Sequence, residues 1–155
     1  MDALDLLEQQ HRDLEELFAG LSAAGPAGRR TALVTQLVRA VEAHSPIEET
    51  VFYPAARKAA PDTTDHVLES IEEHHVVVWM LSELATMDPA DERFTAKVTV
   101  LIENVRHHVK EEEQDWFPQV RKAVGTKDLR QLGEELAAAK SRAPADPLKN
   151  ISATA

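Results

Sequence analysis

Two stretches of this chain repeat the same polar phrase, and the repeat constrains the fold more than any other feature. "HSPIEETVFYP" begins at His44 and "HVKEEEQDWFP" begins at His108, 64 positions later. Both follow the pattern His-x-x-x-Glu-Glu-x-x-aromatic-aromatic-Pro. A His and a Glu four residues apart lie on the same face of a helix. The repeat therefore predicts two equivalent helices, each with a histidine–glutamate pair on one face.

The repeat extends to the helices that precede these two. His11 and His74 are each followed by apolar residues at the same four offsets: Leu14, Leu17, Phe18 and Leu21 in one case, and Val77, Met80, Leu81 and Leu84 in the other. His11 precedes His44 by 33 residues, and His74 precedes His108 by 34. The chain thus consists of two similar helical hairpins, which we expect to pack with approximate two-fold symmetry.

Apolar residues at three- and four-residue steps predict an all-α fold, an up-down-up-down four-helix bundle. The first helix starts after Asp2 as N-cap and ends at "GPAG" (25–28). The others span about 30–60, 65–86, 91–124 and 127–140, and Gly125 stops the fourth. Pro46, Pro54 and Pro118 should bend or interrupt their helices. We assign residues 1–124 to the bundle, 125–140 to a short C-terminal helix and 141–155 to a flexible tail.

Composition excludes several classes of function. The net charge of −10 disfavours nucleic acids and anionic membranes as partners. The chain has no cysteine, so it cannot anchor thiolate zinc sites or iron–sulfur clusters. Its N-terminus has no signal-peptide pattern, and no apolar run approaches the roughly 20 residues of a membrane span. We therefore expect a cytoplasmic protein that acts on a small molecule.

The histidine–glutamate pairs continue apolar stripes, which places them inside the bundle. Val41, His44 and Glu48 follow one stripe, and Val105, His108 and Glu112 follow the other. Unpaired buried carboxylates and imidazoles are costly. A bound metal would compensate them, and the predicted ligands are six: His11, His44, Glu48, His74, His108 and Glu112. This set suits two non-haem iron ions, or manganese less well, with both glutamates bridging and two histidines on each ion.

The same six positions, together with the "FYP" and "WFP" endings, resemble the hemerythrin-like (HHE cation-binding) family. The resemblance covers about residues 1–124. It implies a four-helix bundle that holds a di-iron centre with an oxo or hydroxo bridge. Members of the family variously bind dioxygen, decompose peroxide, handle nitric oxide, or sense oxygen and iron.

One departure from the oxygen-carrying members bears on function. They have a second histidine four residues after the first on the third helix, where this chain has Val78 after His74. They also have His-x-x-x-x-Asp on the fourth helix, where Glu112 follows His108 at a shorter step. Two octahedral ions offer about twelve coordination positions, and this ligand set leaves about two of them open. Two open positions favour peroxide decomposition, a catalase-like reaction; the alternative is dioxygen or nitric oxide binding or sensing without turnover.

Tyr53 stands where the second repeat has Phe117. Its phenolate is a candidate additional ligand for iron. The alternative is a core aromatic residue whose hydroxyl hydrogen-bonds to a carbonyl. If Tyr53 binds iron, the site loses one open position and should show a phenolate-to-iron charge-transfer band.

The remaining polar and aromatic residues receive simpler interpretations. Glu15 is expected to be a solvated or supporting carboxylate, and Glu49 and Glu113 are surface charges or carboxylates that orient imidazoles. Three further histidines are expected at the surface: His66, His75 and His107. Trp79 and Trp116 are interpreted as packing residues rather than electron relays.

Overall fold

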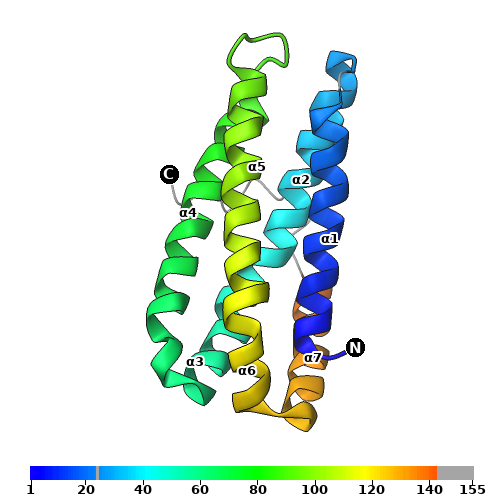
Figure 1. Cartoon of the computed structure of the whole chain (residues 1–155). Helices are drawn as coiled ribbons and strands as arrows, with labels where there is room; N and C mark the ends of the chain where they lie inside the picture. Colours follow the sequence, from blue (N-terminus) through cyan, green and yellow to red (C-terminus); the bar gives the residue numbers. More distant parts are fainter. Residues whose placement is uncertain (24, 143–155) are drawn as a thin grey trace.

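The computed structural model describes residues 1–23 and 25–142, and these form a bundle of long antiparallel helices (Figure 1). The elements in chain order are α1 (Ala3–Ser22), α2 (Ala27–Ile47), η1 (Glu48–Phe52), α3 (Tyr53–Ala59), η2 (Pro61–Thr63), α4 (Thr64–Thr86), α5 (Phe94–Lys110), η3 (Glu111–Trp116), α6 (Phe117–Val124) and α7 (Thr126–Ser141). α1 and α4 each pack against both α2 and α5. The predicted all-α, up-down-up-down fold is therefore confirmed. Residues 143–155 of the predicted tail lie outside the described residues.

The ends of the helices follow from local hydrogen bonding. Asp2 caps α1 as predicted: its side chain accepts from the Asp5 amide at 3.0 Å, and the Asp5 side chain accepts from the Asp2 amide at 3.2 Å. α5 begins at Phe94, three residues later than predicted. The side chain of Asp91 instead accepts from the Arg93 amide at 2.8 Å. Such local bonds hold the backbone in a turn and delay the helix.

Two π-helical turns interrupt the second and fourth helices of the bundle. They are η1 and η3, and each ends two residues before a proline, Pro54 or Pro118. Proline has no amide donor, so the carbonyl four residues earlier loses its α-helical partner. The chain adopts a wider turn in which the amides of Tyr53 and Phe117 bond the carbonyls five residues earlier. The helix axis continues through this widened turn, and α2 likewise continues past Pro46 to Ile47.

Apolar side chains fill the bundle in two clusters. One includes Leu14, Phe18, Leu37, Leu81 and Leu101. The other lies toward the opposite end of the bundle and includes Leu4, Leu7, Phe52, Trp116 and Leu129. Along each of the four long helices, the predicted histidines fall between the two clusters in sequence, as does Glu112, whereas Glu48 directly follows Ile47 of the second cluster. The ligand layer is therefore sealed by apolar packing above and below.

α7 turns back and covers one end of the bundle (Figure 1). Gly125 separates it from α6 with φ of +82°, a conformation that favours glycine. α7 packs against α1, α2 and α6, and buries Leu129 and Leu136. Gly133 lies against the start of α1, where an added Cβ would be 2.9 Å from the carbonyl oxygen of Met1. The close approach of the two backbones therefore depends on glycine at this position.

The two tryptophans have different environments. Trp116 is fully buried, and its indole N–H donates to Thr63 Oγ1 at 3.0 Å, in agreement with a packing role. Trp79 is 64% exposed on α4, so its interpretation as a packing residue was wrong. It lies five residues after His74, which turns its side chain away from the inward face.

Candidate metal centre

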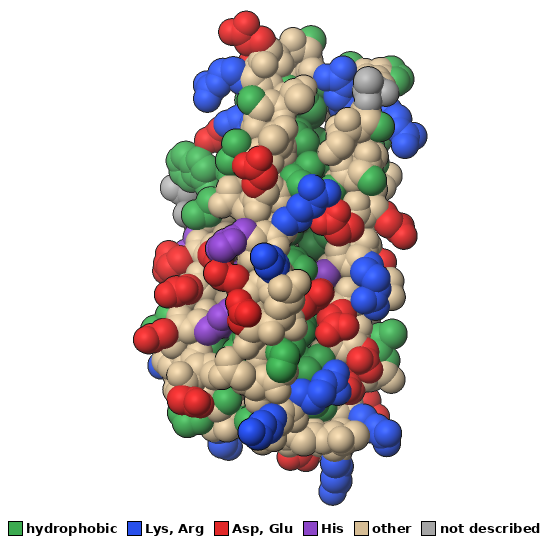
Figure 2. All heavy atoms as spheres, viewed as in Figure 1, with side chains coloured by type: hydrophobic (Ala, Val, Ile, Leu, Met, Phe, Trp, Pro, Cys, Tyr) green, Lys and Arg blue, Asp and Glu red, His purple; other side chains and the backbone are tan. Residues whose placement is uncertain are grey.

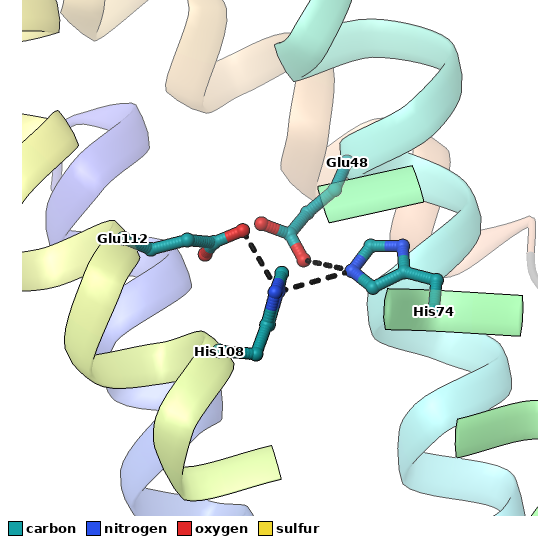
Figure 3. A group of neighbouring side chains, drawn as sticks. All are labelled: Glu48, His74, His108 and Glu112. Atoms are coloured by element: carbon teal, nitrogen blue, oxygen red, sulfur yellow. Dashed lines mark hydrogen bonds and ion pairs between the residues drawn. The ribbon is translucent and has the colours of Figure 1, made fainter. Parts of the chain in front are cut away.

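The fold brings all six predicted ligands together in the middle of the bundle. All six are buried. Their donor atoms form two groups, each within 4.8 Å: His11, His44 and Glu48 in one, and Glu48, His74, His108 and Glu112 in the other. We call His11 and His44 the first half-site, and His74 and His108 the second half-site. Figure 3 shows the second group: the carboxylates of Glu48 and Glu112 point toward one another, with His108 beside both and His74 on the far side of Glu48.

The spacing of the donor atoms matches that of ligands around a metal ion. His74 Nε2 lies 3.2 Å from His108 Nε2, and His108 Nε2 lies 2.9 Å from Glu112 Oε1. His44 Nε2 lies 2.7 Å from Glu48 Oε1. Ligand atoms about 2.1 Å from an octahedral ion are about 3 Å from their nearest neighbours in the coordination shell. The observed spacings are therefore compatible with shared cations.

Several donor atoms in the centre are buried without a hydrogen-bond partner. They are His11 Nε2, both carboxylate oxygens of Glu48, and Glu112 Oε2. The short contact between His44 and Glu48 lacks the alignment of a hydrogen bond, because both atoms are directed at the interior of the site. Burying such atoms unsatisfied costs about 1–3 kcal/mol each. The chemistry of this donor set thus fits a pair of metal cations.

Each imidazole directs its Nδ1 outward and its Nε2 toward the interior. The Nδ1 contacts are His11 with Glu113 Oε1 at 2.7 Å, His44 with Gln10 Oε1 at 2.6 Å, His74 with Glu49 Oε1 at 3.5 Å, and His108 with Glu73 Oε1 at 3.1 Å. Partners of this kind fix the ring orientation and strengthen the imidazole as a ligand. Glu113 thus lies where its predicted role of orienting an imidazole requires. Glu49 lies near His74, but His74 Nδ1 is buried without a hydrogen-bond partner.

Gln10 and Glu73 were not predicted to contribute. Each directly precedes a predicted ligand, His11 or His74, but its side chain reaches the histidine of the next helix. Spacing along one helix cannot reveal such a contact. The available signal is the repeat itself, because Gln10 and Glu73 occupy equivalent positions.

The charges in the centre shift its pKa values. Burial favours the neutral imidazole and lowers the pKa of His44. At His74 burial acts in the same direction, but the carboxylates of Glu48 and Glu49, each 3.5 Å from a ring nitrogen, outweigh it and raise the pKa to about 9. Burial opposes ionisation of Glu48, yet His44 and His74 hold its pKa well below the ordinary value. Without metal, protonated histidine supplies the positive charge that these carboxylates require.

Tyr53 enters the centre from the start of α3. It is 1% exposed, and its hydroxyl donates to Glu112 Oε1 at 2.6 Å and lies 3.2 Å from His74 Nε2. Burial and the charges of Glu112 and Glu48 raise the pKa of Tyr53 well above its usual value. The hydroxyl therefore bonds a carboxylate of the centre rather than a backbone carbonyl. Its repeat counterpart, Phe117, stacks on His11 instead.

The other titratable residues lie as predicted, with one exception. Glu15 is exposed and pairs with Arg106 at 2.8 Å. His75 and His107 are both exposed. His66 was expected to be solvated, which is wrong: its ring stacks on Trp116 with centroids 4.7 Å apart, and its Nε2 is buried without a hydrogen-bond partner.

A further group of donor atoms lies outside the bundle interior. Glu73, His107 and Glu111 have donor atoms within 4.8 Å of one another. His107 is 65% exposed, and Glu73 also contacts His108. Acidic side chains and histidines gather over one side of the face in Figure 2. This group connects the second half-site to the surface.

A four-helix bundle with paired imidazole and carboxylate donors is the architecture of a non-haem metal-binding domain. The profile of the hemerythrin HHE cation-binding domain matches residues 2–120, and the chain belongs to this family. A crystal structure of an HHE cation-binding domain protein from Mycobacterium kansasii has the same fold, with a TM-score of 0.79 and 26% identity. The match covers 92% of this chain and 86% of that one.

Two further relatives are similar in sequence. A protein from Nostoc sp. described as a DNA nickase is 25% identical over 142 residues, which is 92% of this chain and 40% of that protein. An uncharacterised hemerythrin-like protein from Schizosaccharomyces pombe is 26% identical over 125 residues, 80% of this chain and 62% of that one. This chain thus spans less than two thirds of either relative. Among the residues that the structure describes, no helix combines the length and apolar character of a membrane span.

Proposed function

We propose that this chain is a non-haem di-iron protein that decomposes hydrogen peroxide. The observation that carries the proposal is the pair of donor groups, which share Glu48 and hold buried oxygens and nitrogens without partners. The first half-site would hold one ion and the second half-site the other. Glu112 also suits a shared role, since its Oε1 lies 2.9 Å from His108 Nε2 and its Oε2 lies 3.5 Å from His11 Nε2.

Two iron ions bound there would supply the two-electron redox change that peroxide decomposition needs. Iron is the metal that the family resemblance implies, although manganese accepts the same imidazole and carboxylate ligands. The residues of the chain would hold and orient the ions through Nε2 of each histidine. Apolar clusters on both sides exclude bulk water from the ligand layer.

Tyr53 has two roles available in this proposal. Its oxygen lies within 3.2 Å of two donor atoms, so it is also placed to serve as an oxygen ligand of the second half-site. In the arrangement seen here the hydroxyl keeps its proton and donates to Glu112. In that arrangement two bound ions would keep about two coordination positions for peroxide, and Tyr53 would be a proton donor within 3.2 Å of the ligand atoms of the second half-site.

The alternative is a protein that binds or senses dioxygen or nitric oxide without turnover. The ligand set lacks a fifth histidine, because Val78 stands where oxygen-carrying members have a further imidazole ligand. The coordination position that this imidazole would fill stays open, which favours peroxide decomposition over gas binding. A nickase activity is not proposed from the Nostoc relative. A net charge of −10 opposes close approach to the DNA backbone.

The test is to express the protein with iron, measure the metal content, and add hydrogen peroxide in an oxygen electrode. We expect two irons per chain and sustained oxygen evolution. His74→Ala should lose metal and activity, whereas His75→Ala should not, because His75 is exposed and faces away from the centre. Two irons without turnover would favour the gas-binding alternative. Unchanged metal content in both His74→Ala and Glu112→Ala would refute the ligand set.

A further inference from the structure

The two halves of the centre depart from their two-fold symmetry at two places. The residues that contact the centre are otherwise repeated: His11 with His74, His44 with His108, Glu48 with Glu112, and Glu49 with Glu113. The first departure is Gln10, whose counterpart is Glu73. The second is Tyr53, whose counterpart is Phe117. Both departures place additional oxygen or negative charge beside the second half-site.

Gln10 and Glu73 make the same contact in the two halves. Gln10 Oε1 accepts from His44 Nδ1 at 2.6 Å, and Glu73 Oε1 accepts from His108 Nδ1 at 3.1 Å. The contact of the Gln10 amide is the shorter of the two, so both half-sites keep this hydrogen bond to the outer nitrogen of a histidine. They differ in charge, because a carboxylate replaces a neutral amide at the equivalent position.

The neutral amide is not explained by hydrogen bonding. Gln10 is buried, and its Nε2 has no hydrogen-bond partner. A glutamate of nearly the same shape would remove this unsatisfied donor but would bury a charged carboxylate, which costs more than burying an amide. The two positions differ in burial, since Gln10 is 6% exposed whereas the side chain of Glu73 is 27% exposed. The buried position beside the first half-site therefore has a neutral side chain, and the more exposed position beside the second has a charged one.

We propose that Gln10 makes the two metal positions inequivalent, so that the first half-site binds iron(II) more weakly than the second. This inference rests on the proposed di-iron function. When the ring nitrogen that faces away from the metal donates to a carboxylate, the imidazole becomes a stronger electron donor to the metal. A neutral amide acceptor has a smaller effect. In the first half-site one imidazole contacts an outer carboxylate, His11 with Glu113 at 2.7 Å. In the second half-site both do, His108 with Glu73 at 3.1 Å and His74 with Glu49 at 3.5 Å, although the contact with Glu49 is not a hydrogen bond.

Tyr53 acts in the same direction. Its oxygen lies 3.2 Å from His74 Nε2, on the side of the second half-site. The equivalent position beside the first half-site is the ring of Phe117, which offers no oxygen and stacks on His11. The weaker position is thus also the one with fewer oxygen atoms available to a cation.

The experiment is an anaerobic titration of the iron(II)-loaded protein against a ferrous chelator, which measures one Kd for each iron. We expect two separated Kd values in the unmodified protein. Gln10→Glu should lower the larger Kd about tenfold and leave the smaller one unchanged. Glu73→Gln should raise the smaller Kd about tenfold instead. The double exchange should reverse which half-site releases iron first.

Matched controls lie one residue away in each helix. Gln9→Glu makes the same substitution at an exposed position that contacts Asp13 and Arg12, and Glu72→Gln does so at a residue that is 77% exposed. Neither should change a Kd. Equal effects of Gln10→Glu and Gln9→Glu, or a single Kd for two bound irons, would overturn the inference while the di-iron proposal stands. Fewer than two irons per chain in the unmodified protein would overturn both this inference and the di-iron proposal.

Discussion

Tyr53 and Glu112 are joined by a 2.6 Å hydrogen bond across the centre of the bundle, although they lie 59 positions apart in the chain. Tyr53 belongs to the first repeat and Glu112 to the second, so the bond links the two hairpins within the ligand layer. The second repeat has Phe117 at the equivalent position and makes no matching bond. The Tyr53 hydroxyl therefore contacts the ligands of the second half-site, and the first half-site has no equivalent hydroxyl.

If the Tyr53 phenolate binds iron, the aerobic, iron-loaded protein will show a visible phenolate-to-iron absorption band that is absent in Tyr53→Phe. A nearby ferric ion favours the ionised phenol and opposes the raised pKa of the metal-free site. Phenylalanine fills the same volume, so Tyr53→Phe should keep two irons per chain. Absorption spectra and metal analysis of the two proteins provide the measurement.

The outcome separates the two roles of Tyr53. Loss of the band with full metal content would identify the phenolate as a ligand. If the unmodified protein has two irons and no such band, the hydroxyl remains a hydrogen-bond donor to Glu112 and does not bind iron. Trp79→Phe is a suitable control, because it also introduces phenylalanine in place of a larger or more polar aromatic residue, but at a position that is exposed on α4.

Metal loading at pH 7 should release more than one proton per chain. The pKa of His74 is raised to about 9, and those of His11 and His108 are also raised, so these imidazoles hold protons in the metal-free protein. Each must lose its proton to bind a cation. The apparent affinity should therefore increase with pH up to at least about pH 9. A pH-stat titration with iron(II) measures the protons released.

The sign of the stability effect follows from the same shift. Because the folded pKa of His74 lies above its unfolded value of about 6.5, its protonated form stabilises the metal-free fold below that pH. This contribution is lost as the pH rises through about 9. The difference in free energy of unfolding between the metal-free unmodified protein and metal-free His74→Ala should therefore shrink as the pH rises from about 6.5 through about 9. A difference that stays constant over this range in urea titrations would contradict the prediction.

The sequence predicts what depends on spacing within one helix. His44 with Glu48 and His108 with Glu112 share a face at a separation of four residues, and the bundle brings these pairs together. The π-helical turns are less predictable, because a proline at a fixed distance from the glutamate indicates an interruption but not its form. The reach of Gln10 to His44 could not be predicted, since it depends on how neighbouring helices pack.

Gly133→Ala should destabilise the docking of α7 on the start of α1. The new methyl group would lie 2.9 Å from both the Met1 oxygen and the Asp2 carbonyl carbon, which are backbone atoms and cannot rotate away. Overpacking of this kind typically costs about 1–3 kcal/mol. The free energy of unfolding, measured by chemical denaturation and circular dichroism, should fall by that amount.

Gly28→Ala is the matched control for Gly133→Ala. Gly28 lies in the first turn of α2, and an added Cβ there meets nothing within 4 Å. Alanine is favoured over glycine in a helix by up to about 1 kcal/mol, so this variant should be slightly more stable than the unmodified protein. Equal effects of the two substitutions would show that the contact of Gly133 with α1 does not limit packing.

Asp2→Ala should lower the free energy of unfolding by about 1 kcal/mol at neutral pH, because it removes the N-cap of α1. Asp2 also accepts a 2.8 Å hydrogen bond from Arg121 of α6, so the same side chain links two helices.

The stabilisation by Asp2 should depend on pH. Burial opposes ionisation of Asp2, but the bonds from the Asp5 amide and Arg121 outweigh burial and lower its pKa. A lowered folded pKa stabilises the fold above the unfolded value and loses that contribution as the pH falls through the folded one. The difference between Asp2→Ala and the unmodified protein should therefore shrink below about pH 4 in urea titrations. A difference that is constant from pH 7 to pH 2.5 would show that the carboxylate charge is not what stabilises this corner.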